Sequence, residues 1–173
     1  MPPGSTSMRL MIAFVAALAL AAPGTASGQT PFTPAKGPAC KDQSKEFVGA
    51  WTCPGPAGYV VHFFDEGNVV SLTIAPRRSI DKVQEPTAQW RGAGKVFGDK
   101  VQWIMRAGVP KAAVIRTWSR VGDDEREVQE FSVFAINGEK ACLFGAVEVH
   151  TDKANDVALA RAEQAADSRC PEK

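Results

Sequence analysis

The residues with the most definite chemistry in this 173-residue chain are its four cysteines, Cys40, Cys53, Cys142 and Cys170. An even number of cysteines is typical of disulfides in proteins that work outside the cytosol, and four cysteines allow three pairings. Structural zinc sites use closely spaced Cys and His ligands, whereas this chain has no Cys-x-x-Cys pair and no histidine beside a cysteine. We therefore expect two disulfides and no metal site.

The two histidines, His62 and His150, are the natural candidates for acid–base or metal chemistry. Each stands alone, without a His-x-His or His-Glu-x-x-His pattern or an acidic residue at ligand spacing. The acidic run 123–125 lacks the ligand series of a calcium loop. No Gly-x-Ser-x-Gly occurs, so the sequence nominates no catalytic residue, no cofactor and no metal ligand.

The glycine-rich stretch 92–98 resembles a phosphate-binding loop only superficially. Its pattern is Gly-x-Gly-x-x-x-Gly, no Lys-Ser/Thr follows, and the next residues read as a hairpin and not as a helix. We interpret these glycines as strand positions that allow sharp bending.

Aromatic residues and arginines are the remaining candidates for a binding site. The rings can line a cavity for an apolar ligand, or they can fill the core of a small barrel. Arginines beside tryptophans can stack on the rings or bind the acidic headgroup of a ligand. The ligand-binding candidates are Trp90, Trp103, Trp118 and Arg116.

The N-terminal segment 1–28 has the pattern of a secretory signal peptide. Arg9 precedes an unbroken apolar run over 10–22, and small residues follow, with acceptable cleavage after Ala26 or Gly28. The run is shorter than the ~20 residues of a membrane-spanning helix. We expect the mature protein to lie in the periplasm or to be secreted, with no membrane span after cleavage.

The charge balance argues against a nucleic-acid partner. The chain has 20 basic and 19 acidic residues, and segment 1–28 contributes only Arg9 to these counts, so the remaining part has a formal net charge of zero. Nucleic-acid binding usually needs a clustered basic excess.

Strands and one helix must position these residues. Segment 29–46 is rich in Pro, Lys and Gly and predicts an extended or flexible lead-in, so that 47–173 forms a single domain. Hairpins are expected at 65–68, 98–100 and Asn137-Gly138. The predicted strands are 47–53, 59–64, 69–74, 88–97, 101–105, 113–120, 128–136 and 141–149.

The alanine-rich segment 152–169 predicts a helix that starts at a Thr151 or Asp152 cap and stops at Pro171. We expect the fold to be mainly β with a C-terminal helix, of the α+β class. About eight strands would form an antiparallel up-and-down sheet or barrel with the helix packed against it. The face of the helix expected to be buried is Asn155, Leu159, Ala162, Ala166 and Cys170.

A closed sheet of this kind suggests a disulfide pairing. Its first and last strands would be neighbours, which brings the end of the first strand to the start of the last. On this reasoning Cys53 pairs with Cys142, and Cys40 pairs with Cys170.

Two resemblances add expectations. Gly49-Ala50-Trp51 at the first strand, the strand number and the C-terminal helix resemble the lipocalin or calycin plan, whose members bind small apolar ligands in a barrel. A longer series of motifs is similar to uncharacterised exported proteins of Gram-negative bacteria, which implies a periplasmic setting and no particular activity. These motifs are Trp51-Thr52-Cys53, Gly58-Tyr59-Val60, Glu66-Gly67, Gln102-Trp103, Ile115-Arg116-Thr117-Trp118, Ala141-Cys142, Ala154-Asn155, Ala160-Arg161 and Cys170.

The leading expectation for function is a non-enzymatic binding module for a small apolar or acidic ligand. The alternative is a protein-interaction or inhibitor-type envelope protein that acts through its loops or a sheet edge. An enzyme ranks third.

Overall fold

The computed structural model describes Met1 and residues 30–91, 95–122 and 124–171, so the predicted signal peptide lies outside the described residues. None of the helices in these ranges is long and apolar enough to cross a membrane.

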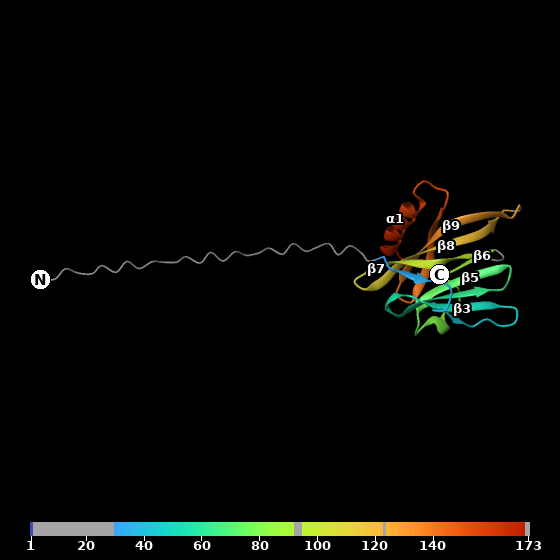
Figure 1. The fold of residues 1–173 in the computed structure, drawn as a ribbon, viewed down its shortest axis with the longest axis horizontal. Helices are drawn as coiled ribbons and strands as arrows, with labels where there is room; N and C mark the ends of the chain where they lie inside the picture. Colours follow the sequence, from blue (N-terminus) through green and yellow to red (C-terminus); the bar gives the residue numbers. More distant parts are fainter. Residues whose placement is uncertain (2–29, 92–94, 123, 172–173) are drawn as a thin grey trace.

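Two antiparallel five-stranded sheets and one C-terminal helix make up the fold (Figure 1). The predicted class, mainly β with a C-terminal helix, is confirmed. The first sheet has the order β2-β3-β4-β5-β6, and the second sheet has the order β1-β7-β8-β9-β10. The strands of the first sheet are β2 (Lys41–Asp42), β3 (Gly49–Pro54), β4 (Tyr59–Asp65), β5 (Val69–Pro76) and β6 (Ala88–Arg91). Those of the second are β1 (Phe32–Pro34), β7 (Phe97–Arg106), β8 (Val109–Val121), β9 (Arg126–Asn137) and β10 (Lys140–Glu148).

The strands follow the predicted up-and-down order within each sheet, but they do not form one closed sheet. β6 ends in the first sheet and β7 begins in the second, so the hairpin expected at 98–100 is wrong. These residues lie inside β7, where the register with β8 shifts between Phe97 and Val101. Turn-type residues occur in strand irregularities as well as in hairpins, which explains the misassignment. The hairpins at 65–68 and Asn137-Gly138 are confirmed.

Residues 30–46 are more ordered than the flexible lead-in predicted for segment 29–46. It supplies β1, which pairs with β7, and β2, which pairs with β3. Ala35 is 1% exposed, and its carbonyl oxygen accepts a hydrogen bond of 2.8 Å from the Trp51 indole. This segment therefore belongs to the folded domain.

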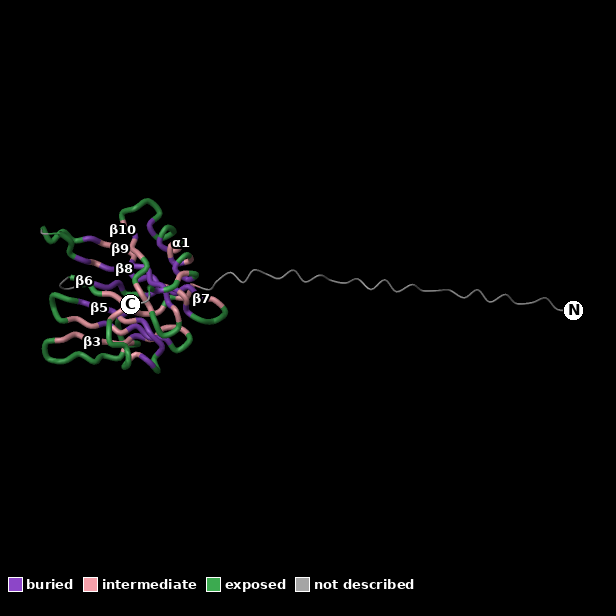
Figure 2. Tube along the Cα trace, turned by 180° about the vertical axis from the view of Figure 1, so that it is seen from behind, coloured by how far each residue is buried: buried purple, intermediate pink, exposed green. Residues whose placement is uncertain are grey.

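The main core lies between the two sheets, and Figure 2 shows the buried stretches of the strands in purple. Strand alternation sends every second side chain into this layer, where aliphatic side chains pack together with large aromatic rings. Trp103, Phe63 and Phe134 are fully buried there. The layer is thus filled by side chains of both sheets.

A second apolar layer joins the second sheet to helix α1 (Ala154–Ala166), which lies on the side of β8 and β9 away from the first sheet (Figure 1). The helix is shorter than the predicted 152–169, and Lys153 occupies the N-cap position. The buried face of the helix also differs from the predicted face. Asn155 was expected to be buried and is exposed, whereas Ala162 and Ala166 are buried as predicted. Alanines contrast weakly with their polar neighbours, so the sequence pattern fixed the face poorly. The buried residues of the helix are Ala154, Ala158, Ala162, Ala165 and Ala166.

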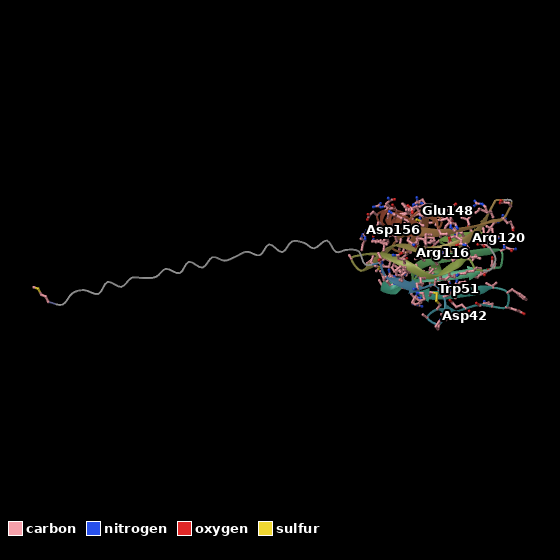
Figure 3. The ribbon with its side chains drawn as sticks, turned by 45° about the horizontal axis from the view of Figure 1, so that its top comes forward. Asp42, Trp51, Arg116, Arg120, Glu148 and Asp156 are labelled. Atoms are coloured by element: carbon pink, nitrogen blue, oxygen red, sulfur yellow. A yellow bond between two sulfur atoms is a disulfide. The ribbon has the colours of Figure 1, made fainter. Side chains whose placement is uncertain are left out.

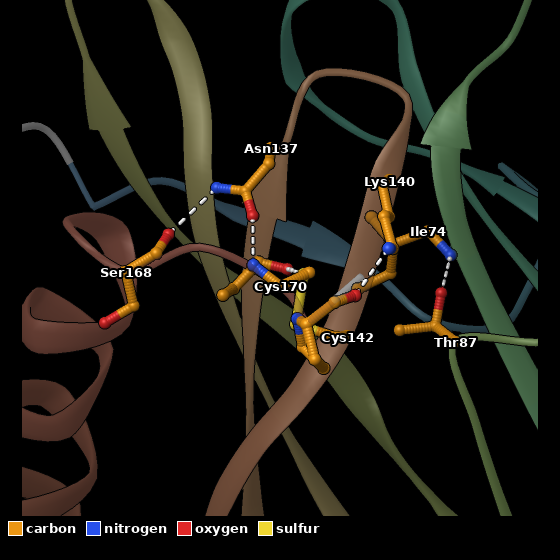
Figure 4. Close-up of a disulfide and its surroundings, with 9 residues drawn as sticks. Ile74, Thr87, Asn137, Lys140, Cys142, Ser168 and Cys170 are labelled. Atoms are coloured by element: carbon orange, nitrogen blue, oxygen red, sulfur yellow. Dashed lines mark hydrogen bonds between the residues drawn. A yellow bond between two sulfur atoms is a disulfide. The ribbon is translucent and has the colours of Figure 1, made fainter. Parts of the chain in front are cut away.

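The four cysteines form two disulfides, as predicted, but the nested pairing is wrong. Cys40 pairs with Cys53, and Cys142 pairs with Cys170. The nested pairing required a closed sheet with β3 and β10 as neighbours, whereas these two strands belong to different sheets. Each disulfide therefore fastens a segment to a strand near it, and the second holds the end of α1 to β10 (Figure 4).

Candidate functional site

Two of the four candidate ligand-binding residues belong to the core. Trp103 is 0% exposed, and its indole N–H donates to the Thr33 hydroxyl at 2.8 Å. Trp90 packs edge-to-face on Phe97 and Phe134, with ring centroids 5.5 and 6.3 Å away. Both rings contribute to the layer between the sheets and are not gathered with the other two candidates.

The other two candidates, Arg116 and Trp118, lie together on the outer face of the second sheet. Strand alternation on β8 points Ile115 and Thr117 into the core and leaves Arg116 and Trp118 on the opposite face. This face contains a groove of about 590 Å³, which we name the outer groove. Arg116 and Asp156, which both line the groove, are labelled in Figure 3.

The outer groove exists because α1 covers only part of the sheet. Both β8 and α1 have 13 residues. A strand rises ~3.3 Å per residue and a helix 1.5 Å, so α1 spans about 20 Å beside a strand of about 43 Å. The uncovered part of β8 becomes the groove floor, with the first turns of α1 as one wall. The lining residues are Phe32, Lys95, Gly98, Asp99, Lys100, Gln102, Val114, Arg116, Trp118, Phe131, Asn155, Asp156 and Leu159.

Arg116 is held by neutral groups. Its Nη2 donates to the Gln129 amide oxygen at 2.6 Å, and its Cζ lies 4.9 Å from the Trp118 ring centroid. Arg116 takes part in none of the ion pairs found among the described residues. The guanidinium charge therefore stays without a carboxylate partner at the groove surface.

Gly98 permits the close approach of β7 to Arg116. A Cβ at this position would lie 3.1 Å from the Arg116 Cβ and 3.3 Å from its carbonyl oxygen. Since such contacts are tighter than ordinary packing, any larger residue would displace the arginine or the strand. The absence of a side chain at Gly98 thus allows Arg116 to occupy its position in the groove.

Three lysines surround Asp99 at the same end of the groove. One Asp99 oxygen lies 2.8 Å from Lys36 Nζ and 3.8 Å from Lys95 Nζ. The pKa of Asp99 is lowered, first by the hydrogen bond from Lys36 and then by the charges of Lys36, Lys95 and Lys100. Lys95 also lies over the Trp118 ring, 4.7 Å from its centroid. This end of the groove is consequently rich in positive charge.

The end near the helix is different in character. Val114, Phe131 and Leu159 line it with apolar surface. Asp156 lies in the first turn of α1, where a carboxylate interacts favourably with the positive end of the helix dipole. The outer groove therefore combines a cationic end with an apolar end.

Sequence reasoning missed most of the groove. It found Arg116 and Trp118, whose i, i+2 spacing on a strand places them on one face. Lys95, Lys100, Phe131 and Leu159 come from other elements, and only the tertiary fold brings them to β8.

The histidines lie elsewhere. His62, on β4, is half-buried with its Nδ1 2.9 Å from the Thr52 hydroxyl, which in turn donates to the Gln43 amide oxygen at 2.6 Å. Burial lowers the pKa of His62, and the charge of Asp81 partly opposes this effect. Within the described ranges, no three His, Cys, Asp or Glu side chains are grouped to hold a metal ion.

An exposed apolar pair marks the free edge of the second sheet. On the edge strand β10, Leu143 is 47% exposed and Phe144 is 39% exposed. The register of β10 with β9 shifts between Leu143 and Gly145, so Phe144 lies at the shift itself.

A scan against protein-family models, a search of curated proteins and a search of solved structures found no match to this chain.

Proposed function

We propose that this protein is an exported, non-enzymatic binding module whose outer groove holds a small ligand with an anionic group and an apolar body. The observation that carries the proposal is Arg116. Its guanidinium is fixed by an amide oxygen and an indole ring, and it has no ion-pair partner within the described part of the chain.

The chemistry of both groove ends supports such a ligand. A guanidinium presents a rigid fork of donors that matches carboxylates and phosphates, and its pairing with neutral groups leaves its charge to attract an anion. The apolar body of the ligand would lie over Val114, Phe131 and Leu159. The groove volume of about 590 Å³ is in the usual range for small-molecule sites, ~300–1,000 Å³.

Several observations support an exported location. The two disulfides fit an oxidising compartment, and the segment before residue 29 has the signal-peptide pattern. The resemblance to exported proteins of Gram-negative bacteria favours the periplasm.

The test is calorimetric titration with decanoate, which has one anionic group and a flexible apolar chain. Replacing Arg116 by Gln removes a charged hydrogen-bond donor worth about 1.5–3 kcal/mol, so affinity should fall by about tenfold or more. Arg120→Gln is the matched control, because Arg120 lies on the same strand and is paired with Glu125 at 3.0 Å. Equal affinities for the wild type and Arg116→Gln would contradict the proposal.

A second candidate is a protein-interaction module that uses the edge of β10. The exposed Leu143 and Phe144 favour it, because apolar residues on a free strand edge are suited to pairing with another chain. Native mass spectrometry of protein purified from its own cells separates the candidates. A bound small molecule supports the groove, and a bound protein that is lost in Leu143→Lys supports the edge.

A further inference from the structure

The cationic end of the outer groove carries more positive charge than its own carboxylate can offset. Arg116 and Lys100 take part in none of the ion pairs of the described residues. Asp99 is shared between Lys36 and Lys95, and the second of these contacts is long, at 3.8 Å. Two cations of the described residues therefore take part in no ion pair, and a third is only weakly paired.

These cations form one contiguous group. Lys36 and Lys95 approach the same oxygen of Asp99, and Lys100 is close enough to lower the pKa of that carboxyl. Lys95 and Arg116 approach the same Trp118 ring, at 4.7 and 4.9 Å from its centroid. A single oxyanion bound at Arg116 thus has Lys95 and Lys100 within reach of their long, flexible side chains.

The number of free charges distinguishes between kinds of anion. A monocarboxylate carries one negative charge and is satisfied by the arginine fork alone, which leaves Lys100 unpaired. A phosphate monoester carries about −1.5 to −2 at neutral pH and offers three acceptor oxygens. It can accept from the guanidinium and from two ammonium groups together.

We infer that the ligand of the outer groove is a phosphate monoester with an apolar substituent, whose phosphate is held by Arg116, Lys100 and Lys95. This inference rests on the proposed function of the groove. The apolar substituent lies toward Leu159, because Asp156 at that end would repel the phosphate.

The experiment compares decyl phosphate with decanoate. The two ligands have alkyl chains of similar length and differ in the charge of the headgroup. At about pH 8 decyl phosphate should bind about tenfold tighter, because it pairs with at least one additional cation. Lys100→Gln should weaken decyl phosphate about fivefold and decanoate less than about twofold. Lys41→Gln, a substitution of an exposed lysine on β2 in the other sheet, is the control and should change neither affinity.

The pH profile provides a readout that a merely structural role of Lys100 would not produce. The second phosphate pKa is about 6, so decyl phosphate should bind more tightly as pH rises from about 5.5 to about 8. Decanoate stays largely ionised over this range and should show a flat profile. The pKa of Asp99 is lowered, so this carboxyl stays ionised as well, and neither histidine lines the groove. The charged groups that line the cationic end are Lys95, Lys100, Arg116 and Asp99, with Lys36 paired to Asp99, and Asp156 lies at the opposite end near the helix.

Two further arms identify the source of the phosphate. Inorganic phosphate that binds as tightly as decyl phosphate indicates free phosphate as the ligand. Co-sedimentation with vesicles that contain phosphatidic acid, lost in Arg116→Gln, indicates a lipid headgroup.

The inference and the proposed function fail in different ways. Equal affinities for decyl phosphate and decanoate at about pH 8, or a flat pH profile for both ligands, overturn the phosphate assignment. If decanoate binding still depends on Arg116, the proposed binding function of the groove stands. If neither ligand depends on Arg116, both the phosphate assignment and the proposed function are overturned.

Discussion

Replacing Cys142 and Cys170 together by serine is expected to destabilise the fold without detaching the helix. The disulfide joins residues 28 positions apart, and closing a loop of this length stabilises a protein by about 3.5 kcal/mol in the chain-entropy model. For a domain of this size the loss corresponds to a fall in Tm of about 10 °C.

Hydrogen bonds at the same place explain why the helix should stay docked (Figure 4). Asn137 donates through Nδ2 to the Ser168 carbonyl at 2.9 Å and accepts from the Cys170 N–H at 2.6 Å. The Lys140 ammonium donates to the Pro171 carbonyl. Circular dichroism of the double variant at 25 °C should therefore retain the helical signal, and Asn137→Ala in that background should remove part of it.

The assay is urea denaturation of the wild type and the double variant, together with Cys40→Ser/Cys53→Ser. The latter pair closes a loop of 13 residues, so its removal should cost about 3 kcal/mol. Peptide mapping of the unreduced protein should recover Cys40 with Cys53 and Cys142 with Cys170. Recovery of Cys53 linked to Cys142 would refute the two-sheet reasoning, since that link needs the first and last strands to be neighbours.

Three other predictions concern the sheet and the groove. Thr117→Val should lower the free energy of unfolding by about 1–3 kcal/mol, because the buried Ser132 hydroxyl 2.8 Å away loses its hydrogen-bond partner. Adding Ser132→Ala should recover most of this loss, as measured by urea denaturation. The pKa of Glu130 is raised, first by burial and then by a neighbouring carboxylate, so the folded state binds the proton more tightly than the unfolded state. Stability should therefore fall as pH rises from the unfolded pKa through the raised folded pKa, and Glu130→Gln should remove this dependence in thermal melts at several pH values. Gly98→Ala should cost about 1–3 kcal/mol and weaken decanoate binding in calorimetry, since its Cβ presses on the groove arginine. Unchanged decanoate affinity would show that Gly98 does not position that side chain.

The strands could be predicted from the sequence because their signal is local. Alternation and turn residues located the strands β3 to β10 and the hairpins at 65–68 and Asn137-Gly138. The predicted strand 88–97 was too long, since β6 ends at Arg91 and Phe97 already belongs to β7. The division into two sheets was missed because it depends on which strands pair after β6, and Gly98–Lys100 reads locally like a turn. The ordering of segment 29–46 was also missed, because β1 is held by residues of β7 about 70 positions away, such as Gln102 opposite Phe32.

The candidate site residues also differ in whether local sequence or tertiary packing decides their position. Arg116 and Trp118 could be nominated because their spacing on one strand is a local property. Trp90 and Trp103 have the same residue type as Trp118, and only the packing of the two sheets decides that they fill the core. A tryptophan in a strand therefore carries no information about its side of the sheet until the neighbouring positions are assigned to the core.

The position of the groove depends on contacts that fix α1 along the sheet. The Arg106–Glu163 ion pair joins the helix to β7, and Arg161 donates to the Ala146 carbonyl on β10. The disulfide at Cys170 then holds the C-terminal end. With that end fixed, the start of the helix at Ala154 decides how much of β8 stays uncovered. Each further helical turn before this residue would extend the helix by about 5.4 Å, which is more than one strand residue. Val114 is already covered, at 5% exposed, so two such turns would extend the helix past it toward Arg116. The short length of α1 is therefore what leaves the arginine open to a ligand.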